Sequence, residues 1–516
     1  MNSNTNMNSN IKPESNPWVV YGICLLISVI FFFLFGFNSP IYFFNTDPDF
    51  NWFMTMGNGL AHGKIPYRDL FDHKGPIVYF VFAFAHFFWN PRIVIFIIEI
   101  ICMSLFFFFA YRISRKRLNT FYSLACIPFL AIVVFTSWCR LGRGSNVEGF
   151  CLPILTYFLL CWLEFLIEKR SWNWTRSLCL GLCFGIIFWI KYTLFYFMLL
   201  PMLFWLIISI RRHEFRTLVT NILLMFLGVL IVTLPILIFY ASQNALSDLF
   251  YVYFYINTVY SSFTISPTLL FIYFKKLFEF SLFVIFLVTL GVGSFTRRHW
   301  QSREGTLLLA SFFSTFILTL CSCSGSIYYF NILVPYTVFG IIEIVNFTKS
   351  KLLIKINLKM FYVFYVFACI AICTPFSILF RALQINKCAP LTFANIISDY
   401  EAESNIKASL FCYKIIDYGF YNATGIIPND YYFAQSNFDE KKDQLPEMYS
   451  SFKNSIIEHK YDFVITELNT WYKENEFLSK YYSPYPDKEN CSQIHIEIQY
   501  GQDGYKTFIL LKAISI

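Results

Sequence analysis

Charged residues are scarce in this chain, at 14% of its 516 residues, whereas soluble domains usually carry about 25%. Metal-binding cysteine pairs are missing too, because no CxxC motif occurs and Cys321 and Cys323 lie only two positions apart. The phosphate-binding pattern GxxxxGK[ST] is absent, and no internal repeat of about 20–50 residues is visible. These absences argue against a zinc framework, a P-loop and a repeat protein.

Hydrophobic residues are abundant instead, at 57%, with aromatic residues at 21%. This composition excludes a disordered, collagen-like or coiled-coil chain. A membrane-spanning helix needs roughly 20 apolar residues. We predict an α-helical polytopic membrane protein with 11 spans, at residues 18–38, 92–111, 120–137, 150–167, 177–190, 193–210, 218–240, 278–295, 306–320, 328–346 and 360–379.

Positive charge indicates how these spans are oriented. Residues 1–380 carry a net charge of +13 and residues 381–516 a net charge of −5. Short basic loops usually face the cytoplasm. Five such loops occur, at residues 112–117, 168–176, 211–216, 297–303 and 349–359. All five are cytoplasmic only if the short apolar segment 76–90 does not span, so we expect a juxtamembrane or re-entrant helix there, on the outer side.

This topology divides the chain into three parts. Residues 1–17, rich in Asn and Ser, are expected to be a disordered cytoplasmic tail. Residues 18–380 form the transmembrane domain, and residues 381–516 form an α/β domain outside the cytoplasm. In that last domain, alternating hydrophobicity predicts strands at 461–468 and 508–511, and 446–460 favours a helix.

The first outer loop, residues 39–75, concentrates ionisable side chains. It carries Asp47 and Asp49 at its start and a mixed cluster at its end, comprising Lys64, Arg68, Asp69, Asp72, His73 and Lys74. The stretch 50–62 between them is amphipathic, which would hold both clusters at the membrane surface. Chemistry at the membrane surface suits a lipid-linked substrate. A carboxylate can take a proton from an acceptor hydroxyl there, and cations can neutralise the phosphate of a polyprenyl-phosphate leaving group.

Each of these residues has a simpler interpretation. Asp47 precedes a helix-like stretch and suits an N-cap as well as it suits catalysis. Asp49 fits a solvated carboxylate in a first helical turn. Lys74 precedes an apolar segment, where lysines extend toward the headgroups. His73 fits a hydrogen-bonded loop residue better than a metal ligand.

The loop resembles the GT-C superfamily of membrane glycosyltransferases, which includes lipid A aminoarabinose transferases and protein O-mannosyltransferases. The resemblance lies in NTDPDF, at 45–50, followed by GKIPYRDLFDHKGP, at 63–76, and an apolar helix. It implies that a carboxylate of this loop is the catalytic base, with Asp47 at the best-matching position, and that Lys74 contacts the donor phosphate. The superfamily has adjacent Asp and Glu residues at this position, whereas this chain has Asp-Pro-Asp, so Asp49 is the alternative base. Tyr328 stands where many relatives have histidine.

Further candidates lie outside this loop. Loop 138–149 contributes Arg140 and Arg143 as phosphate ligands, and Glu148 as a substrate contact; a solvated turn is the alternative. Lys191, between two short spans, is a further phosphate ligand or a residue that extends to the surface. Arg68 of loop 39–75 is also a candidate phosphate ligand. Asp69, Asp72, Glu148 and Tyr328 are the candidate substrate contacts. Asp72 and His73 are the candidate ligands of a divalent metal ion. No other cofactor is expected.

We therefore expect an inverting glycosyltransferase of a plasma membrane, with the N-terminus cytoplasmic and the C-terminus outside. Its partners would be a polyprenyl-phosphate-linked sugar, an envelope acceptor and membrane lipids, without nucleic acid. The frequent Asn, Ile, Lys and Phe residues fit a bacterial source. Two alternatives are a transporter or flippase of a lipid-linked sugar, and a binding protein that acts through residues 381–516. Paired charges at the membrane midplane would favour the transporter.

Overall fold

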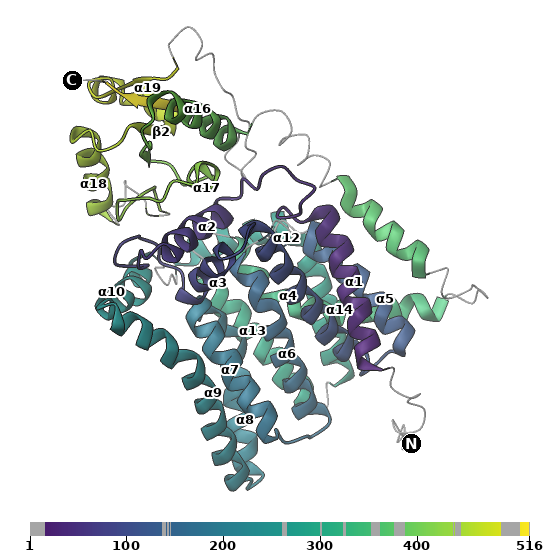
Figure 1. Cartoon of the computed structure of the whole chain (residues 1–516). Coiled ribbons are helices and arrows are strands. Elements are labelled where there is room, and N and C mark those ends of the chain that lie inside the picture. The colour runs from purple at the N-terminus through teal and green to yellow at the C-terminus, as the bar shows by residue number, and fades with distance from the viewer. Residues whose placement is uncertain are drawn as a thin grey trace, which may run out of the picture. The chain divides into compact units, whose positions relative to one another are not determined.

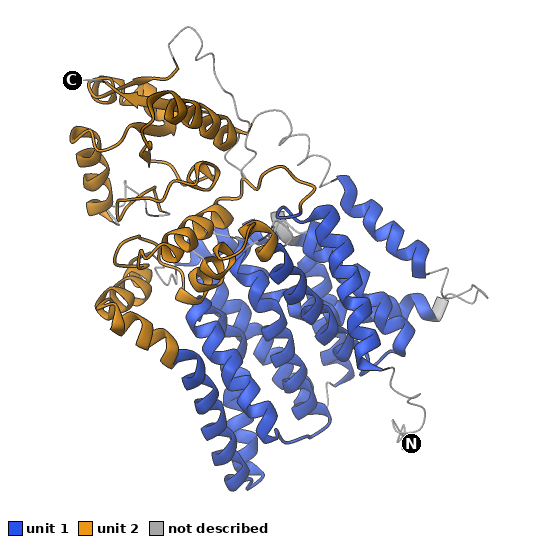
Figure 2. Ribbon diagram, in the orientation of Figure 1, with its two compact units in different colours: residues 1–39, 96–233, 263–375 blue, residues 40–95, 234–262, 376–516 orange. Residues whose placement is uncertain are grey.

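The computed structural model describes residues 16–136, 141, 144, 146–260, 266–299, 302–322, 327–351, 362–375, 388–436, 438, 445–486 and 506–514. Its contacts divide the chain into two compact units (Figure 2). Unit 1 comprises residues 1–39, 96–233 and 263–375, and unit 2 comprises residues 40–95, 234–262 and 376–516. The first loop and the C-terminal part therefore belong to the same compact unit.

Long apolar helices dominate the first 375 residues, because a helix satisfies its own backbone hydrogen bonds where lipid offers none. They are labelled in Figure 1 where there is room. Their bounds are α1 Pro17–Phe35, α4 Pro91–Ser114, α5 Thr120–Thr136, α6 Val147–Ile167, α7 Trp174–Lys191, α8 Tyr196–Arg211, α9 Phe215–Ser242, α12 Pro267–Arg298, α13 Arg303–Ser322, the 3₁₀ helix η4 Ile327–Tyr336, α14 Thr337–Lys351 and a helix at Tyr362–Pro375. The fold is that of a multi-pass helical membrane protein.

Within the described residues, each of the 11 predicted spans overlaps one or two of these helices. By length and composition, the described residues contain seven helical stretches able to cross a membrane, or eight if the bent α12 is one span. The stretch Trp174–Arg211, with 38 residues, is one of the seven. α5 and Tyr362–Pro375 are shorter apolar helices. The count of 11 thus stays a prediction.

The stretch Trp174–Arg211 is a hairpin rather than one long rod. The 3₁₀ turn η2, Tyr192–Phe195, separates α7 from α8. Near the two ends of the stretch, the rings of Trp172 and Trp205 stack with centroids 4.7 Å apart. The Ser171 hydroxyl also donates to Glu214 Oε2 over 2.9 Å. These contacts require α8 to run back alongside α7, so the two spans predicted here are distinct.

Polar contacts place the described residues of the five basic loops at the same end of unit 1. Glu164 accepts hydrogen bonds from Lys116 and Arg176, at 2.9 and 2.6 Å, and so joins the first two loops. The Ser171–Glu214 bond adds the third loop. Glu343 is bound by Arg117 and Arg298, which adds the fourth. Lys349, at the start of the fifth loop, lies 5.4 Å from the ring centroid of Tyr122. Tyr122 stands in the first turn of α5, which follows the first basic loop.

Glycines allow two helix pairs of unit 1 to approach closely. A Cβ on Gly181 of α7 would lie 2.1 Å from the carbonyl oxygen of Met225 in α9. A Cβ on Gly340 of α14 would lie 2.0 Å from the carbonyl oxygen of Leu287 in α12. Small residues at such crossings let backbones pack where no hydrophobic effect drives association.

Unit 2 begins with two short helices, α2 Pro48–Ala61 and α3 Pro76–His86. α3 has 11 residues, which gives it a length of about 16 Å, short of the roughly 30 Å hydrocarbon core. This length agrees with the expectation that segment 76–90 does not span. Residues 246–260 add α10 Leu246–Phe250, the π-helical turn η3 Tyr251–Ile256 and α11 Asn257–Tyr260.

The C-terminal part of unit 2 is a small α/β arrangement with a four-stranded sheet of order β1-β2-β4-β3. β1 pairs with β2 in parallel, and β4 is antiparallel to both of its neighbours. The predicted strands are β2 and β4, and the predicted helix is α18. The bounds are α16 Ala389–Ser404, β1 Leu410–Cys412, α17 Phe420–Thr424, α18 Pro446–Ile457, β2 Phe463–Glu467, α19 Leu468–Lys473, α20 Asn475–Leu478, β3 Tyr482–Pro484 and β4 Phe508–Ala513.

Candidate functional site

Asp47 is the N-cap of α2. Its Oδ1 accepts hydrogen bonds from the backbone N–H of Asp49 (3.1 Å) and of Phe50 (3.3 Å). Pro48 occupies the first helical turn, where its missing N–H costs nothing. The Asp-Pro-Asp sequence thus starts the helix, and it turns Asp49 to the side of α2 that faces the second cluster of the loop.

Asp49 and that second cluster line one small cavity within unit 2. The cavity has a volume of about 30 Å³, which is room for a water molecule or a hydroxyl group. Three consecutive residues of the loop, Asp72, His73 and Lys74, face Asp49 across it. The remaining lining residues are Pro48, Trp52, Phe53, Ile416, Gln435 and Ser436. A carboxylate and an ammonium group therefore flank a space of hydroxyl size.

Asp72 is buried and held by two hydrogen bonds. Its Oδ1 accepts from the backbone N–H of His73 (2.7 Å), and its Oδ2 accepts from the hydroxyl of Tyr79 in α3 (2.8 Å). Burial raises the pKa of Asp72 to about 6; the charge on Lys74 and these hydrogen bonds oppose the rise, and Asp49 adds to it. This carboxyl group changes its charge close to neutral pH.

The backbone of Lys74 is fixed by two tyrosines. Its N–H donates to the Tyr79 hydroxyl over 3.1 Å, and its carbonyl oxygen accepts from the Tyr67 hydroxyl over 2.5 Å. Gly75 and Pro76 follow as N-cap and first residue of α3. The motif Lys-Gly-Pro thus places the lysine directly before the start of α3, where it lines the cavity.

His73 is buried beside Asp72. Its Nδ1 lies 3.5 Å from Asp72 Oδ1, and its ring packs edge-on against Phe438 with centroids 5.5 Å apart. Its carbonyl oxygen accepts from Asn257 Nδ2 over 2.6 Å. Among the residues that the structure describes, no group of three or more His, Cys, Asp or Glu side chains is close enough to hold a metal ion. We therefore derive no step through a metal.

Arg68 and Asp69 form a separate turn of the same loop. Two guanidinium nitrogens of Arg68 donate to Asp69, at 2.9 and 2.8 Å, and a third nitrogen donates to the carbonyl oxygen of Gln243 over 2.7 Å. Asp69 Oδ2 also accepts from the N–H of Ile65. The Arg68 hydrogen bonds lower the pKa of Asp69. Neither residue lines the cavity.

A second polar cluster lies in unit 1. Glu148 stands in the first turn of α6 and pairs with Lys191 at the end of α7. The side chain of Glu148 is 1% exposed and that of Lys191 11%. The Lys191 ammonium lies 3.9 Å from the ring centroid of Tyr329 and 5.0 Å from that of Tyr328. Three of the predicted residues, Glu148, Lys191 and Tyr328, are thus brought together.

Helix geometry places this cluster at the end of unit 1 opposite to the basic loops. Glu148 begins α6, and Glu164, which binds Lys116 and Arg176 of the basic loops, ends it. Sixteen helical residues separate the two carboxylates by about 24 Å. Glu99, in α4, accepts from Asn38 Nδ2 over 3.0 Å. Arg140 and Arg143, predicted as phosphate ligands, lie outside the described residues.

Several residues that line the cavity were not predicted from the sequence. Trp52 packs on Phe433 with ring centroids 4.8 Å apart. Its indole N–H is buried and has no hydrogen-bond partner within the part of the chain that the structure describes. Ile416, Gln435 and Ser436 reach the cavity from the C-terminal part. Tyr79 does not line the cavity, but it binds Asp72 and Lys74, and its position one helical turn after Pro76 is the one sequence signal for that role. The lining residues named above follow only from tertiary packing.

Comparison with known proteins identifies the fold. Residues 73–239 match the sequence model of the family described as dolichyl-phosphate-mannose-protein mannosyltransferase. No curated protein matches the chain significantly. Two solved structures of ArnT from Cupriavidus metallidurans are similar over 96% of this chain, each with 9% identity. The structure bound to undecaprenyl phosphate has a TM-score of 0.56 and is covered over 98% of its length; the apo structure has a TM-score of 0.58 and is covered over 97%.

These similarities span the membrane helices and the C-terminal part together. A likeness at this identity concerns the arrangement of the backbone. The mannosyltransferase match adds a sequence signal that begins at His73, inside the candidate site, and ends in α9. The resemblance to the GT-C superfamily is thereby confirmed: the chain has the fold of these membrane glycosyltransferases, and its residues 73–239 match one of their families.

Proposed function

We propose that this protein transfers a sugar from a polyprenyl-phosphate donor to an acceptor of the cell envelope, on the outer face of the membrane. The observation that carries the proposal is the cavity in which Asp49 faces Lys74, within a GT-C fold. One similar structure is ArnT bound to undecaprenyl phosphate, and the matching family is described by dolichyl phosphate mannose. Both descriptions support a polyprenyl-phosphate-linked sugar as the donor.

The proposed reaction is a single displacement with inversion. The acceptor hydroxyl attacks the anomeric carbon, so the bond from that carbon to the acceptor oxygen forms while its bond to the phosphate oxygen breaks. The hydroxyl proton passes to a carboxylate, and the phosphate leaves with the bonding electron pair. Lys74 stabilises the charge that develops on the phosphate. Phosphate leaves without protonation, so one base and one cation suffice.

Asp49 is the base that the geometry favours. It lines the cavity together with Lys74 and Asp72. One oxygen of Asp47 instead accepts two backbone hydrogen bonds of the helix that carries Asp49. In this assignment, Asp47 orients the first turn of α2, and Asp49 receives the proton. Asp47 remains the alternative base, as the sequence resemblance implies.

The other predicted ligands take supporting roles in this proposal. Lys191 remains a proposed phosphate ligand, and in unit 1 it is paired with Glu148. Arg140 and Arg143 remain proposed phosphate ligands. Asp72 holds the loop beside Lys74. Arg68 and Asp69 stabilise the turn that precedes it.

The orientation of the protein is also part of the proposal. Five basic loops meet at one end of unit 1, and positively charged loops face the cytoplasm. The segment 40–90 connects the opposite ends of α1 and α4, which supports the proposal that it and the C-terminal part lie outside the cytoplasm. A bacterial plasma membrane fits this arrangement. A transporter is not favoured, because the ion pairs described above lie at the helix ends rather than at midspan.

The test uses the purified full-length chain in detergent, where no compartments exist. A panel of polyprenyl-phosphate-linked hexoses and pentoses is supplied with envelope extract as acceptor, and release of polyprenyl phosphate is measured. We expect release with at least one donor. Asp49→Asn should lower turnover at least about 100-fold, the usual size of a general-base contribution. Asp47→Asn should have a small effect, because Asn also caps helices.

Asp399→Asn is the matched control, since this aspartate is exposed on α16 away from the cavity. A reversed ranking, with Asp47→Asn inactive and Asp49→Asn active, would assign the base to Asp47 within the same reaction. No release from any donor of the panel, with a correctly folded protein, would refute the proposed function.

A further inference from the structure

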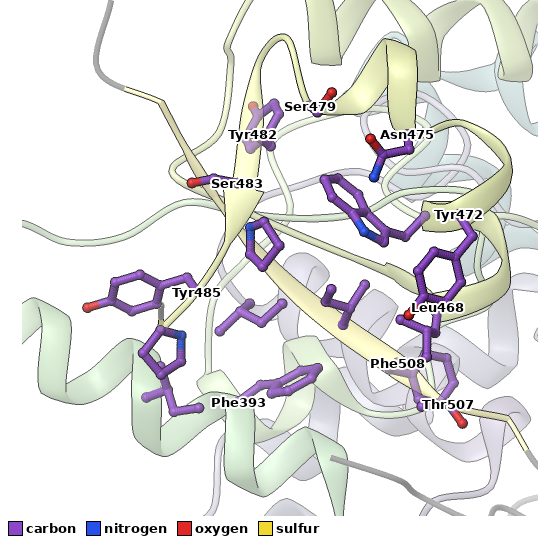
Figure 3. Close-up of a pocket in the computed structure, with 16 residues that line it drawn as sticks. Phe393, Leu468, Tyr472, Asn475, Ser479, Tyr482, Ser483, Tyr485, Thr507 and Phe508 are labelled. Atoms are coloured by element: carbon purple, nitrogen blue, oxygen red, sulfur yellow. The ribbon is translucent and has the colours of Figure 1, made fainter. Parts of the chain in front are cut away.

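A second cavity lies in the C-terminal part of unit 2, apart from Asp49 and Lys74. Its volume is about 490 Å³, within the range of roughly 300–1,000 Å³ typical of small-molecule sites. Figure 3 shows its 16 lining residues as sticks. They come from α16, from α19 and α20 with the residues that follow, and from β3 and β4 with the residues beside them.

Aromatic rings form much of the wall. Trp471, Tyr482 and Phe508 are buried, whereas Tyr472 is 65% exposed and is drawn among the lining side chains in Figure 3. An exposed ring beside a buried aromatic wall offers flat apolar faces to a ligand. The C–H faces of sugar rings pack on such surfaces, while the hydroxyl groups of the sugar seek polar partners at the edge.

Polar partners of the right kind surround the rings. Asn475, Ser479, Ser483 and Thr507 contribute an amide and three hydroxyl groups. An amide and a hydroxyl can each donate and accept hydrogen bonds, as a sugar hydroxyl does. None of the 16 lining residues is charged. A phosphate or carboxylate ligand would lack a counter-charge in this lining, so the cavity suits a neutral ligand.

The wall is also held in place. The backbone N–H of Tyr485 donates to the carbonyl oxygen of Leu510 over 3.0 Å. The Lys512 ammonium lies 4.9 Å from the ring centroid of Tyr485 and fixes the ring by a cation–π contact. Pre-organised side chains lose little conformational entropy when a ligand binds.

Contacts within unit 2 connect this cavity to α2. The ring of Phe508, which lines the cavity, lies 5.3 Å from the rings of Tyr418 and Phe420. The carbonyl oxygen of Tyr418 accepts a hydrogen bond from Asn51 of α2 over 3.2 Å. A ligand in the cavity and the carboxylates at the start of α2 therefore belong to one packed body.

We propose that this cavity binds a short, uncharged saccharide that forms part of the acceptor. That the saccharide is part of the acceptor rests on the proposed function. That the cavity binds a neutral saccharide rests on the cavity alone. The saccharide packs a ring face against Tyr472 and Trp471, and its hydroxyl groups bond with Asn475, Ser479 and Ser483. The protein thereby selects envelope molecules that carry neutral sugar.

The test measures saccharide binding to the full-length chain in detergent by isothermal titration calorimetry. The probes are a neutral mannose disaccharide, a neutral N-acetylglucosamine disaccharide and a glucuronic acid-containing disaccharide. We expect a neutral probe to bind and the acidic probe to bind at least tenfold more weakly. Tyr472→Ala and Asn475→Ala should each weaken neutral binding about tenfold; a tenfold change corresponds to a typical hydrogen bond or ring contact. Both side chains are exposed, so folding is preserved.

Lys473→Ala, next to Tyr472 but outside the cavity lining, is the control and should bind as the unmodified protein does. Asp49→Asn separates the two proposals: it should abolish transfer and leave saccharide binding unchanged. Transfer activity without neutral saccharide binding, or binding that Tyr472→Ala and Asn475→Ala leave unchanged, refutes the saccharide site while the proposed function stands. Saccharide binding that these variants weaken, without transfer from any donor, supports the site and refutes the proposed function.

Discussion

The hydroxyl of Thr55 donates a hydrogen bond of 2.9 Å to Oδ2 of Asp417, across 362 positions of sequence. Both residues are buried, at 2% and 0% exposure. The other oxygen of Asp417 accepts from the backbone N–H groups of Gly419 and Phe420, each over 2.8 Å. One carboxylate thus binds the backbone at the start of α17 and anchors α2, whose first turn carries Asp49.

The first prediction concerns this anchor. Thr55→Val keeps the shape of the side chain and removes the donor, which leaves a lone pair of the buried Asp417 carboxylate without its partner. We expect destabilisation of about 1–3 kcal/mol, measured by thermal unfolding in detergent, with reduced sugar transfer. Ser450→Ala, at an exposed position of α18 in the same unit, is the control. Unchanged stability of Thr55→Val would show that the bond contributes nothing.

The second prediction follows from the pKa of Asp72. Its pKa is about 6 in the folded protein and about 3.9 in an unfolded chain. Between these values, the folded protein binds more protons than the unfolded one, so its stability decreases as the pH rises from about 4 to about 6. Asp72→Asn should remove that part of the slope, which amounts to about 1–3 kcal/mol. Stability curves at several pH values test this.

The matched variant for that experiment is Asp69→Asn, because Arg68 lowers the pKa of Asp69 instead of raising it. Its stabilising contribution is present above the unfolded pKa and is lost as the pH falls through the folded one. The two variants should therefore change the pH dependence with opposite signs. Equal slopes in both would contradict the burial of Asp72.

The third prediction concerns the Glu148–Lys191 pair. Breaking a buried ion pair by removing one partner typically costs about 3–5 kcal/mol, because the other charge stays buried. We expect Lys191→Met and Glu148→Gln each to lower the thermal stability markedly. The double variant should lose less than the sum of the two single losses. Additive losses would mean that the two side chains act independently.

The fourth prediction separates two effects at glycines. Gly419 has φ +110°, and a Cβ there would lie 2.6 Å from the ring of Phe44 and 2.8 Å from Asn51 Oδ1. Gly425 has φ +71° with open space around it. Gly425→Ala should destabilise the protein only by the cost of a left-handed backbone conformation, which is about 1–2 kcal/mol for a residue with a Cβ. Gly419→Ala should cost more and reduce transfer, since it pushes α17 away from α2. Equal thermal shifts would contradict this packing.

The membrane part was largely predictable because it depends on local composition. Apolar runs marked each helix, and the break at Lys191 correctly separated α7 from α8. The N-cap interpretation of Asp47 followed from its place before a helix-like stretch, where Asp is favoured, and the structure confirms it. Strand alternation likewise located β2 and β4.

The site could be predicted only in part, because three of its ten lining residues come from the distant C-terminal part. The charges in loop 39–75 pointed to Asp49, Asp72, His73 and Lys74, which the structure brings together. The pairing of Arg68 with Asp69 instead of with a ligand depends on a turn whose Tyr67 has φ +73°. The contributions of Ile416, Gln435 and Ser436 have no local signal, since they come from more than 340 positions further along the chain.

The Thr55–Asp417 bond also sets an order of events during synthesis. After Thr55 has been made, the ribosome must add 362 more residues before its partner exists. At about 5–20 residues per second, this takes roughly 20–70 s. Throughout this interval the nascent chain already has its early membrane helices but not the wall that Ile416, Gln435 and Ser436 provide. The cavity that Asp49 and Lys74 line is therefore complete only after residue 436 has been made.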